Sequence, residues 1–224
     1  MPNRVVVPQA RRVILASASP ARLQTLRHAG LDPEVIVPEV DEEAVRHTSP
    51  AELTGERARL KGESVIEALR RAGELDEPLV LLACDSMLEI EGRVHGKPGT
   101  REAAVVRWYR MRGRQGLLYT GHYAALALGP DDVRHQVRSA VTGVTFADLT
   151  DAEIAAYADT GEPQRVAGAF TIDGYGGAFV TRITGDPHNV IGISLPLVRQ
   201  MLLDLGVAWH TLWRTDDVAD QIQS

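Results

Sequence analysis

Two long apolar segments joined by a short polar turn constrain the fold of this chain more than any other feature. Segments 117–128 and 133–146 both have strand composition, and Gly129-Pro130-Asp131-Asp132 lies between them. This pattern predicts a long antiparallel pair, with Gly143 as a candidate bulge. Because strands and helices alternate along the rest of the chain, we expect an α/β fold with an elongated mixed β-sheet flanked by helices.

The other elements are predicted from apolar runs and capping residues. Apolar runs predict strands at 13–16, 35–37, 79–88 and 178–180. Helices are expected after the N-cap residues Ser19 and Thr100 and from Pro196. Two more are expected behind capping boxes, one over 50–71 after Ser49 and Glu52 and one after Thr150 and Glu153. Gly62 lies inside the helix expected over 50–71, where a glycine costs about 1 kcal/mol of helix stability. No composition break divides the chain, so we expect a single domain over 1–224, with a core over 12–215 and frayed termini.

Composition limits the function classes. The 224 residues are 44% hydrophobic, enough for one sizeable core or for two lobes around a cleft. A net charge of -6 argues against an extended nucleic-acid surface but leaves room for a small polyanion in a local basic pocket. The single cysteine, Cys84, excludes an intramolecular disulfide and fits a reducing compartment. No run has the length of a membrane span or the form of a signal peptide, so we expect a cytoplasmic protein.

Two segments suggest phosphate chemistry at the ends of strands. A strand that runs into Ser17-Ala18-Ser19 and a helix at Pro20 is typical of an anion site, and Arg22 adds a cation. Taken alone, however, the segment is better explained as a helix cap. Asp85 follows the buried run 79–84, so it is expected at the carboxyl end of a strand, where it could hold Mg²⁺ or act as a base. The alternative is an acid that caps the next turn.

Three further segments carry functional residue types with ordinary alternatives. Gly96-Lys97-Pro98-Gly99 presents a lysine to a phosphate or is a plain β-turn. The acidic residues at 39 and 41–43 suit a hard cation or form a solvated loop. Segment 168–177 is rich in glycine, which lets backbone approach a flat ligand, and its interleaved apolar residues favour an ordered segment over a flexible loop.

The histidines are scattered and none has zinc-ligand spacing. His95 lies beside Lys97 and could line the same site. The others are expected at the surface: His28, His47, His122, His135, His188 and His210.

Taken in order, these segments resemble the Maf family from about Val13 to Leu203. The matching segments are ILASASPARLQTLRHAGL, PEVDEE, the helix lysine Lys61, LLACDSMLEIEGRVHGKP, YTGHYAAL, DAEIAAYADTGEP, AGAFTIDGYGG and GDPHNVIGISLPL. The resemblance implies a fold similar to that of the inosine triphosphate pyrophosphatases, with two lobes around a central cleft. It also implies cleavage of a nucleoside triphosphate between its α and β phosphates, a divalent cation (Mg²⁺ or Mn²⁺), a cytoplasmic location and a homodimer.

The resemblance also assigns roles to single residues. Asp85 matches the catalytic aspartate, and Glu42 matches the acidic residue that holds metal together with it. The implied substrate-binding residues are Ser17, Ser19, Arg22, Lys61 and Lys97. Clearing of non-standard nucleotides and arrest of cell division are the implied biological roles. The alternatives are a regulator of septum formation that acts by binding and a phosphatase of another nucleotide class.

Three positions that would select the base depart from the branches of the family. The branch acting on dTTP and UTP carries Arg, Thr and Gln where this chain has Ala21, Ser86 and Asp173, and the branch acting on 7-methyl-GTP carries Trp, Gln and Glu. The combination resembles a third branch of high-GC Gram-positive bacteria, for which only general nucleoside triphosphate pyrophosphatase activity is implied. Because a carboxylate accepts but cannot donate hydrogen bonds, Asp173 favours base edges that present N–H groups and disfavours the pyrimidine-specific branch.

Overall fold

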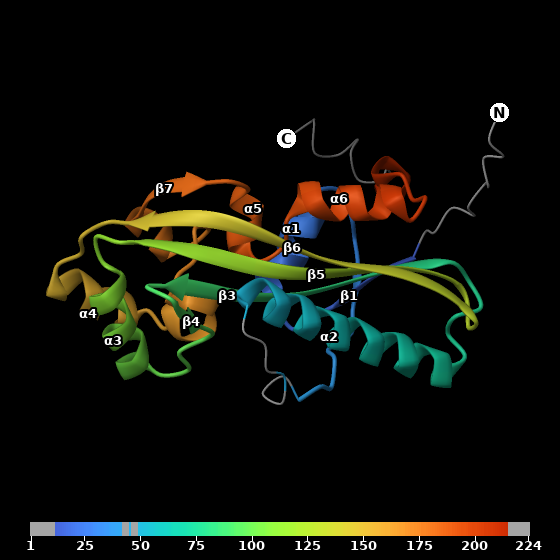
Figure 1. Ribbon diagram of the computed structural model, residues 1–224, viewed down its shortest axis with the longest axis horizontal. Coiled ribbons are helices and arrows are strands. Elements are labelled where there is room, and N and C mark those ends of the chain that lie inside the picture. The colour runs from blue at the N-terminus through green and yellow to red at the C-terminus, as the bar shows by residue number, and fades with distance from the viewer. Residues whose placement is uncertain (1–11, 42–44, 46–48, 215–224) are drawn as a thin grey trace.

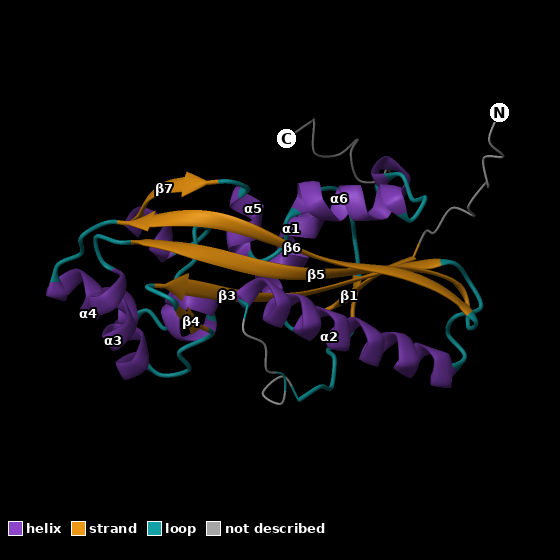
Figure 2. Ribbon diagram, in the orientation of Figure 1, coloured by secondary structure: helices purple, strands orange, loops and turns teal. Residues whose placement is uncertain are grey.

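A computed structural model describes residues 12–41, 45 and 49–214, which build one seven-stranded mixed sheet with helices on both faces (Figures 1 and 2). The strands are β1 (Arg12–Ala16), β2 (Glu34–Val35), β3 (Leu79–Ile90), β4 (Arg93–His95), β5 (Gln115–Gly129), β6 (Asp132–Phe146) and β7 (Val180–Thr184). The α-helices are α1 (Pro20–His28), α2 (Pro50–Ala72), α3 (Arg101–Met111), α4 (Asp151–Asp159), α5 (Pro187–Ile191) and α6 (Leu195–Asp204). None of the described helices is long and apolar enough to cross a membrane.

The strand pairing confirms the mixed sheet predicted from the sequence. The strand order is β2-β1-β3-β5-β6-β7, and β4 pairs with β3. β1 runs parallel to β2 and β3, whereas every other neighbouring pair is antiparallel. The predicted hairpin of β5 and β6 forms from two strands of 15 residues each, and it extends along the long axis of the molecule (Figure 1).

The apolar runs in β1 and β3 are continuous because both faces of the sheet are covered there. Along β1, Val13 and Leu15 pack into a cluster with α1 and α6, whereas Ile14 and Ala16 pack against α2. Since successive side chains of a strand point to opposite faces, such a strand needs apolar residues at every position. This half of the molecule is therefore a sheet between two helical layers.

The other half is built around Trp108 of α3, which is fully buried. Its ring meets Phe146, Tyr157 and Phe179 edge-on, and its Nε1 donates to the carbonyl of Ala169 at 2.9 Å. These contacts order the glycine-rich segment into short 3₁₀ helices, as the interleaved apolar residues predicted. One of them extends to Phe179, so β7 begins at 180 instead of spanning the predicted 178–180.

Glycines bring α2 unusually close to β5. A Cβ at Gly121 would lie 2.2 Å from the backbone of Thr54, and one at Gly62 would lie 2.2 Å from the ring of Tyr123. The sequence predicted only that Gly62 would be tolerated in the helix, but the packing leaves no space for any side chain there. The close approach of α2 to the sheet sets the height of the α2 side chains above β3 and β5.

Helix caps agree only in part with the sequence. Thr150 and Glu153 form the predicted capping box of α4. In the capping box predicted at the start of α2, the hydrogen bond expected at the Ser49 side chain does not form, so this part of the prediction is wrong.

The predicted bulge at Gly143 is also wrong. Gly143 pairs regularly with Leu117 on one side and with Thr184 on the other. The irregularity between β5 and β6 lies beside the turn, between Ala127 and Gly129. A Cβ at Gly143 would lie 3.2 Å from Gln115 Nε2 and 3.5 Å from Thr184 Cβ, so the strand is regular there and closely flanked by side chains.

Candidate functional site

A cleft of about 1030 Å³ lies between the two halves and receives residues from both. It brings together most of the residues singled out in the sequence: Ser19, Ala21, Arg22, Lys61, Asp85, Ser86, Lys97 and Asp173. Ser17 is buried beside Arg22, and its hydroxyl accepts hydrogen bonds from Arg22 Nη1 at 3.1 Å and from Ser19 N at 3.2 Å. Glu42 lies outside the described residues.

Asp85 stands at a gap in the sheet and not at the end of its strand. β1 pairs with β3 only as far as Ala16 and Ala83, and β4 joins the same strand from Leu88 onward. Between these two partners, β3 continues through Asp85 while pairing with β5 on its other side. The sequence-based position was therefore wrong by half a strand, although the reason for it holds: Asp85 lies where a parallel neighbour ends, as ligand sites of α/β sheets do.

Asp85 forms a buried ion pair with Lys61. Lys61 Nζ lies 2.7 Å from Asp85 Oδ1, and the two side chains are 9% and 10% exposed. The other carboxylate oxygen, Oδ2, is buried without a hydrogen-bond partner among the described residues. A buried acceptor in this state is costly, so Oδ2 is the atom of the cleft best placed to receive a water, a ligand hydrogen or a cation.

Arg22 connects the walls of the cleft through four hydrogen bonds. Its Nε donates to the Gly192 carbonyl at 2.8 Å, and its Nη1 donates to Ser17 Oγ and to the Cys84 carbonyl, the latter at 2.9 Å. Its Nη2 donates to Ser86 Oγ at 3.1 Å. Of five guanidinium hydrogens, these bonds leave one for a ligand. Arg22 therefore supplies charge to the cleft while holding α1, β3 and the turn after α5 in place.

The Ser86 side chain is occupied by the protein itself. Its hydroxyl receives Arg22 Nη2 and lies 3.0 Å from Thr120 Oγ1, which in turn donates to the Asn189 carbonyl at 3.2 Å. Ser86 thus lines the cleft and also joins Arg22 to a buried polar network in β5.

Comparison with known proteins identifies the family. A family profile described as Maf-like protein matches residues 12–205. The chain belongs to the Maf family. The resemblance noted in the sequence is thereby confirmed.

Curated relatives of this Maf chain are similar over most of their length. The chain is 55% identical over 204 residues to a protein of Cutibacterium acnes, covering 89% of this chain and 93% of that one. It is 49% identical to a protein of Streptomyces coelicolor, covering 93% and 98%, and 48% identical to one of Salinispora tropica, covering 90% and 87%. All three bear the name nucleoside triphosphate pyrophosphatase.

The likeness to solved structures is distant. The Ham1 protein of Staphylococcus aureus covers 95% of this chain and 96% of that chain, with 15% sequence identity and a TM-score of 0.38. The assignment of the Maf chain to the α/β class rests on its own mixed sheet.

Two cations of the Maf cleft were missed in the sequence, Arg57 and Arg165. Arg57 lies four residues before Lys61 on α2, and residues four apart share a helix face. That spacing was available in the sequence as a signal. The Arg57 Nε is buried without a hydrogen-bond partner among the described residues, so this side chain also retains donor capacity beside the cleft.

Glu162 was missed too, and it organises the glycine-rich wall. Its carboxylate accepts the Tyr157 hydroxyl at 2.7 Å and the backbone N–H groups of Tyr175 and Gly176 at 2.9 Å. A Cβ at Gly174 would lie 2.2 Å from this carboxylate, which explains why the segment is glycine there. Asp173 follows on the same wall, and its Oδ1 accepts the hydroxyl of Thr171.

Two histidines, His95 and His122, lie elsewhere than the sequence suggested, and the thiol of Cys84 stays protonated. His95 lines a separate cavity and not the cleft of Lys97. His122 is fully buried in β5, so the expected surface position is wrong. Its Nε2 accepts a hydrogen bond from the Ser194 N–H at 2.8 Å, and burial lowers the pKa of His122 to about 4. Burial also raises the pKa of the Cys84 thiol to about 11, so this residue carries no thiolate at neutral pH.

The cleft offers few protein ligands for a metal. No group of three or more His, Cys, Asp or Glu side chains that could hold a metal occurs within the described parts of the chain. Mg²⁺, however, commonly binds one or two carboxylates and completes its shell with water and phosphate oxygens. The unpartnered Asp85 Oδ2 fits such a shared site, and Asp41 lines the same cleft.

Proposed function

We propose that this chain hydrolyses a nucleoside triphosphate to a nucleoside monophosphate and pyrophosphate. The observation that carries the proposal is the family membership over residues 12–205, with relatives near 50% identity that are named nucleoside triphosphate pyrophosphatases. The cleft supports it with a cluster of cations on a chain of net charge -6: Arg22, Arg57, Lys61, Lys97 and Arg165. Such a cluster would neutralise phosphate charge and let a water approach phosphorus.

Both halves of the cleft would contribute to phosphate binding. Lys97 and Arg165 from one half and Arg57 from the other would contact the phosphates, since all three line the cleft. Arg22 would act chiefly by its charge and by holding the loop of Ser17 and Ser19. Lys61 would orient the carboxylate of Asp85 through the bond to Oδ1.

Asp85 would then serve the attacking water. The water would donate a hydrogen bond to Oδ2 and transfer its proton there while its oxygen bonds to the α-phosphorus. The bond from the α-phosphorus to the bridging oxygen breaks, and pyrophosphate leaves with the electron pair. Asp85 and Glu42 would hold Mg²⁺ or Mn²⁺, and the cation would supply neutralising charge to the phosphates.

Base choice would depend on the wall that carries Asp173. As an acceptor, its carboxylate favours bases that present N–H groups, so we expect no preference for dTTP or UTP. Ala21 and Ser86 line the same cleft and would shape the base pocket. A panel of ordinary and modified nucleoside triphosphates tests this expectation, and a strong preference for dTTP and UTP would refute it.

Product analysis tests the reaction itself. With Mg²⁺ or Mn²⁺ present, we expect a monophosphate and pyrophosphate in equal amounts, and Asp85→Asn should lower kcat by at least about a thousandfold, within the range for loss of a group at the reaction centre. Release of orthophosphate would point to another nucleotide phosphatase. If neither pyrophosphate nor orthophosphate is released, the remaining alternative is a regulator of cell division that acts by binding.

The proposal also includes the oligomeric state of the protein and its location in the cell. We propose a homodimer in the cytoplasm, on the basis of the family alone. Light scattering of the purified chain would give a mass near twice 24.4 kDa if the dimer forms.

A further inference from the structure

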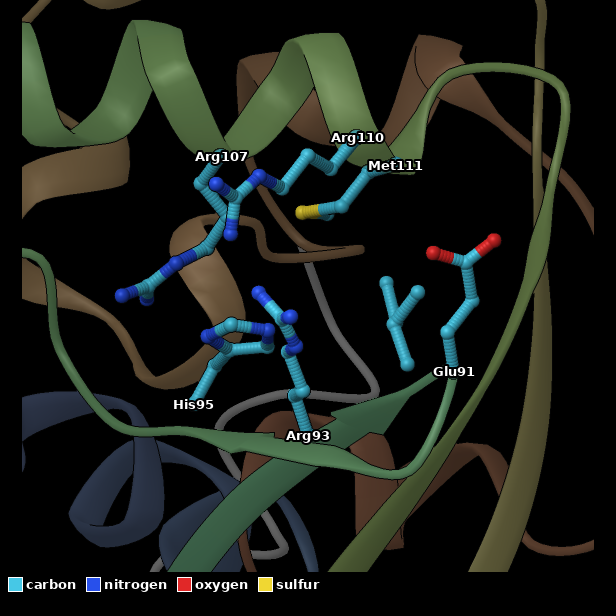
Figure 3. Close-up of a pocket in the computed structure, with 7 residues that line it drawn as sticks. Glu91, Arg93, His95, Arg107, Arg110 and Met111 are labelled. Carbon is cyan, nitrogen blue, oxygen red and sulfur yellow. The ribbon is translucent and has the colours of Figure 1, made fainter.

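A second cavity, of about 330 Å³, lies between β4 and α3, apart from the cleft. Its lining is dominated by Arg93, His95, Arg107 and Arg110. Figure 3 shows Arg93 and His95 rising from the strand side and Arg110 reaching down from the helix, with Glu91 across the cavity. The sequence drew attention to His95 only as a neighbour of Lys97.

Local geometry explains why these side chains gather. Arg93 and His95 are two residues apart in a strand, so they point to the same face. Arg107 and Arg110 are three residues apart in α3, so they share one side of the helix. The strand face and the helix side meet at the cavity.

The positive charge in this cavity is poorly compensated. Within the described part of the chain, Arg93 and Arg110 make no side-chain hydrogen bond or ion pair, and Arg107 donates only to the carbonyl of Gly96. The one acid of the lining, Glu91, is paired with Arg114. At the two ends of α3, by contrast, arginines are paired with acids: Arg101 with Asp159 and Arg112 with Asp151.

The environment of His95 reflects this field. Burial lowers the pKa of His95, and the charges of Arg107, Arg110 and Arg93 lower it further. Burial also lowers the pKa of Arg107. Like charges held this close repel one another, and a bound anion would relieve the repulsion.

We propose that this cavity is a second anion site that binds a small phosphate-type oligoanion, such as an inorganic di- or triphosphate. Guanidinium groups match phosphate oxygens in two-point hydrogen bonds, and three arginines line this one space. The cavity has the size of a small-ligand site. Its occupant would be connected to the cleft through Arg107, which donates to the carbonyl of Gly96, the residue before Lys97.

The site can be tested without any enzymatic reaction. Tripolyphosphate, titrated calorimetrically into the full chain in metal-free buffer, should bind at two sites per chain, the cleft and this cavity. The double variant Arg93→Gln/Arg110→Gln should lose one site, with its affinity falling at least tenfold. Lys97→Gln should weaken the other site and spare the cavity.

A matched control separates a built site from general charge. Arg101→Gln/Arg112→Gln removes the same amount of charge from the two ends of α3, where both side chains are paired with acids. It should keep both sites, and all variants should melt within a few degrees of the parent chain.

Three results would overturn the proposal. The first is full binding by Arg93→Gln/Arg110→Gln, the second is equal weakening in both double variants, and the third is a single wild-type site that only Lys97→Gln removes. A single site that only Arg93→Gln/Arg110→Gln removes would support the cavity and count against phosphate binding in the cleft.

Discussion

Lys61 Nζ donates to Asp85 Oδ1 across 2.7 Å, in a buried pair that joins α2 to the middle of β3. Removing two charges from water is expensive, and their attraction repays this only when the geometry is good and both partners remain. The pair therefore ties the position of α2 to the carboxylate that we propose to activate water.

We expect both Lys61→Gln and Asp85→Asn to destabilise the chain. Each variant leaves one buried charge without its partner, so each should lower the free energy of unfolding by about 3 kcal/mol. Urea denaturation of both variants and of the double variant measures this, and strictly additive losses would show that the two residues are not coupled.

Arg22→Lys should impair both stability and catalysis, although it keeps the charge. A lysine ammonium cannot reach Gly192, Cys84 and Ser86 at once, as the guanidinium does. We expect a loss of about 2 kcal/mol in the free energy of unfolding and a fall in kcat/KM of about a hundredfold. Arg27→Lys, in the same helix but exposed, is the matched control and should change neither. Unchanged kinetics in Arg22→Lys would show that only charge matters at this position.

Gly121→Ala should be strongly destabilising for steric reasons. The added methyl group would meet the backbone of Thr54 at 2.2 Å, so α2 must move away from β5. We expect a loss of about 3 kcal/mol or more and a lower kcat, because Lys61 would move with the helix. Gly129→Ala, in the same strand but with no atom within 4 Å of the new methyl group, should stay within about 0.5 kcal/mol of the parent. Equal thermal stability of the two variants would contradict this packing.

His122 should make the chain sensitive to acid. Its pKa is about 4 when folded, against an ordinary value of about 6.5, because burial disfavours the charged ring. Below pH 6.5 the unfolded chain takes up this proton and the folded chain does not. The stabilisation is therefore complete above about pH 6.5 and is lost as the pH falls towards 4, by about 3 kcal/mol in all.

The measurement for His122 is the free energy of unfolding at several pH values between 7 and 4. We expect His122→Gln to have a shallower slope than the parent chain, since it removes the titrating ring. His28→Gln tests whether the loss of an exposed histidine has the same effect. A slope in His122→Gln equal to that of the parent would mean that other groups govern the acid sensitivity.

Much of the secondary structure and most of the cleft residues could be predicted from the sequence. The β5–β6 hairpin, the cap of α1 at Ser19 and the capping box of α4 follow from residues within a few positions of one another. Patterns of this range act on the backbone locally, so they are readable without the fold. The family motifs added the grouping of Lys61, Asp85 and Lys97 around one cleft.

Only the tertiary structure decided how those residues are used. The gap beside Asp85 depends on where β1 ends and β4 begins, and Arg22 reaches the Cys84 carbonyl across 62 positions of sequence. The burial of His122 and the need for Gly62 likewise depend on helices that pack from distant parts of the chain. Such contacts are set by the packing of layers against each other, which no short pattern encodes. The sequence by itself thus determined the fold class and the chemical types at the site, and the packing determined which of them are held by the protein and which face a ligand.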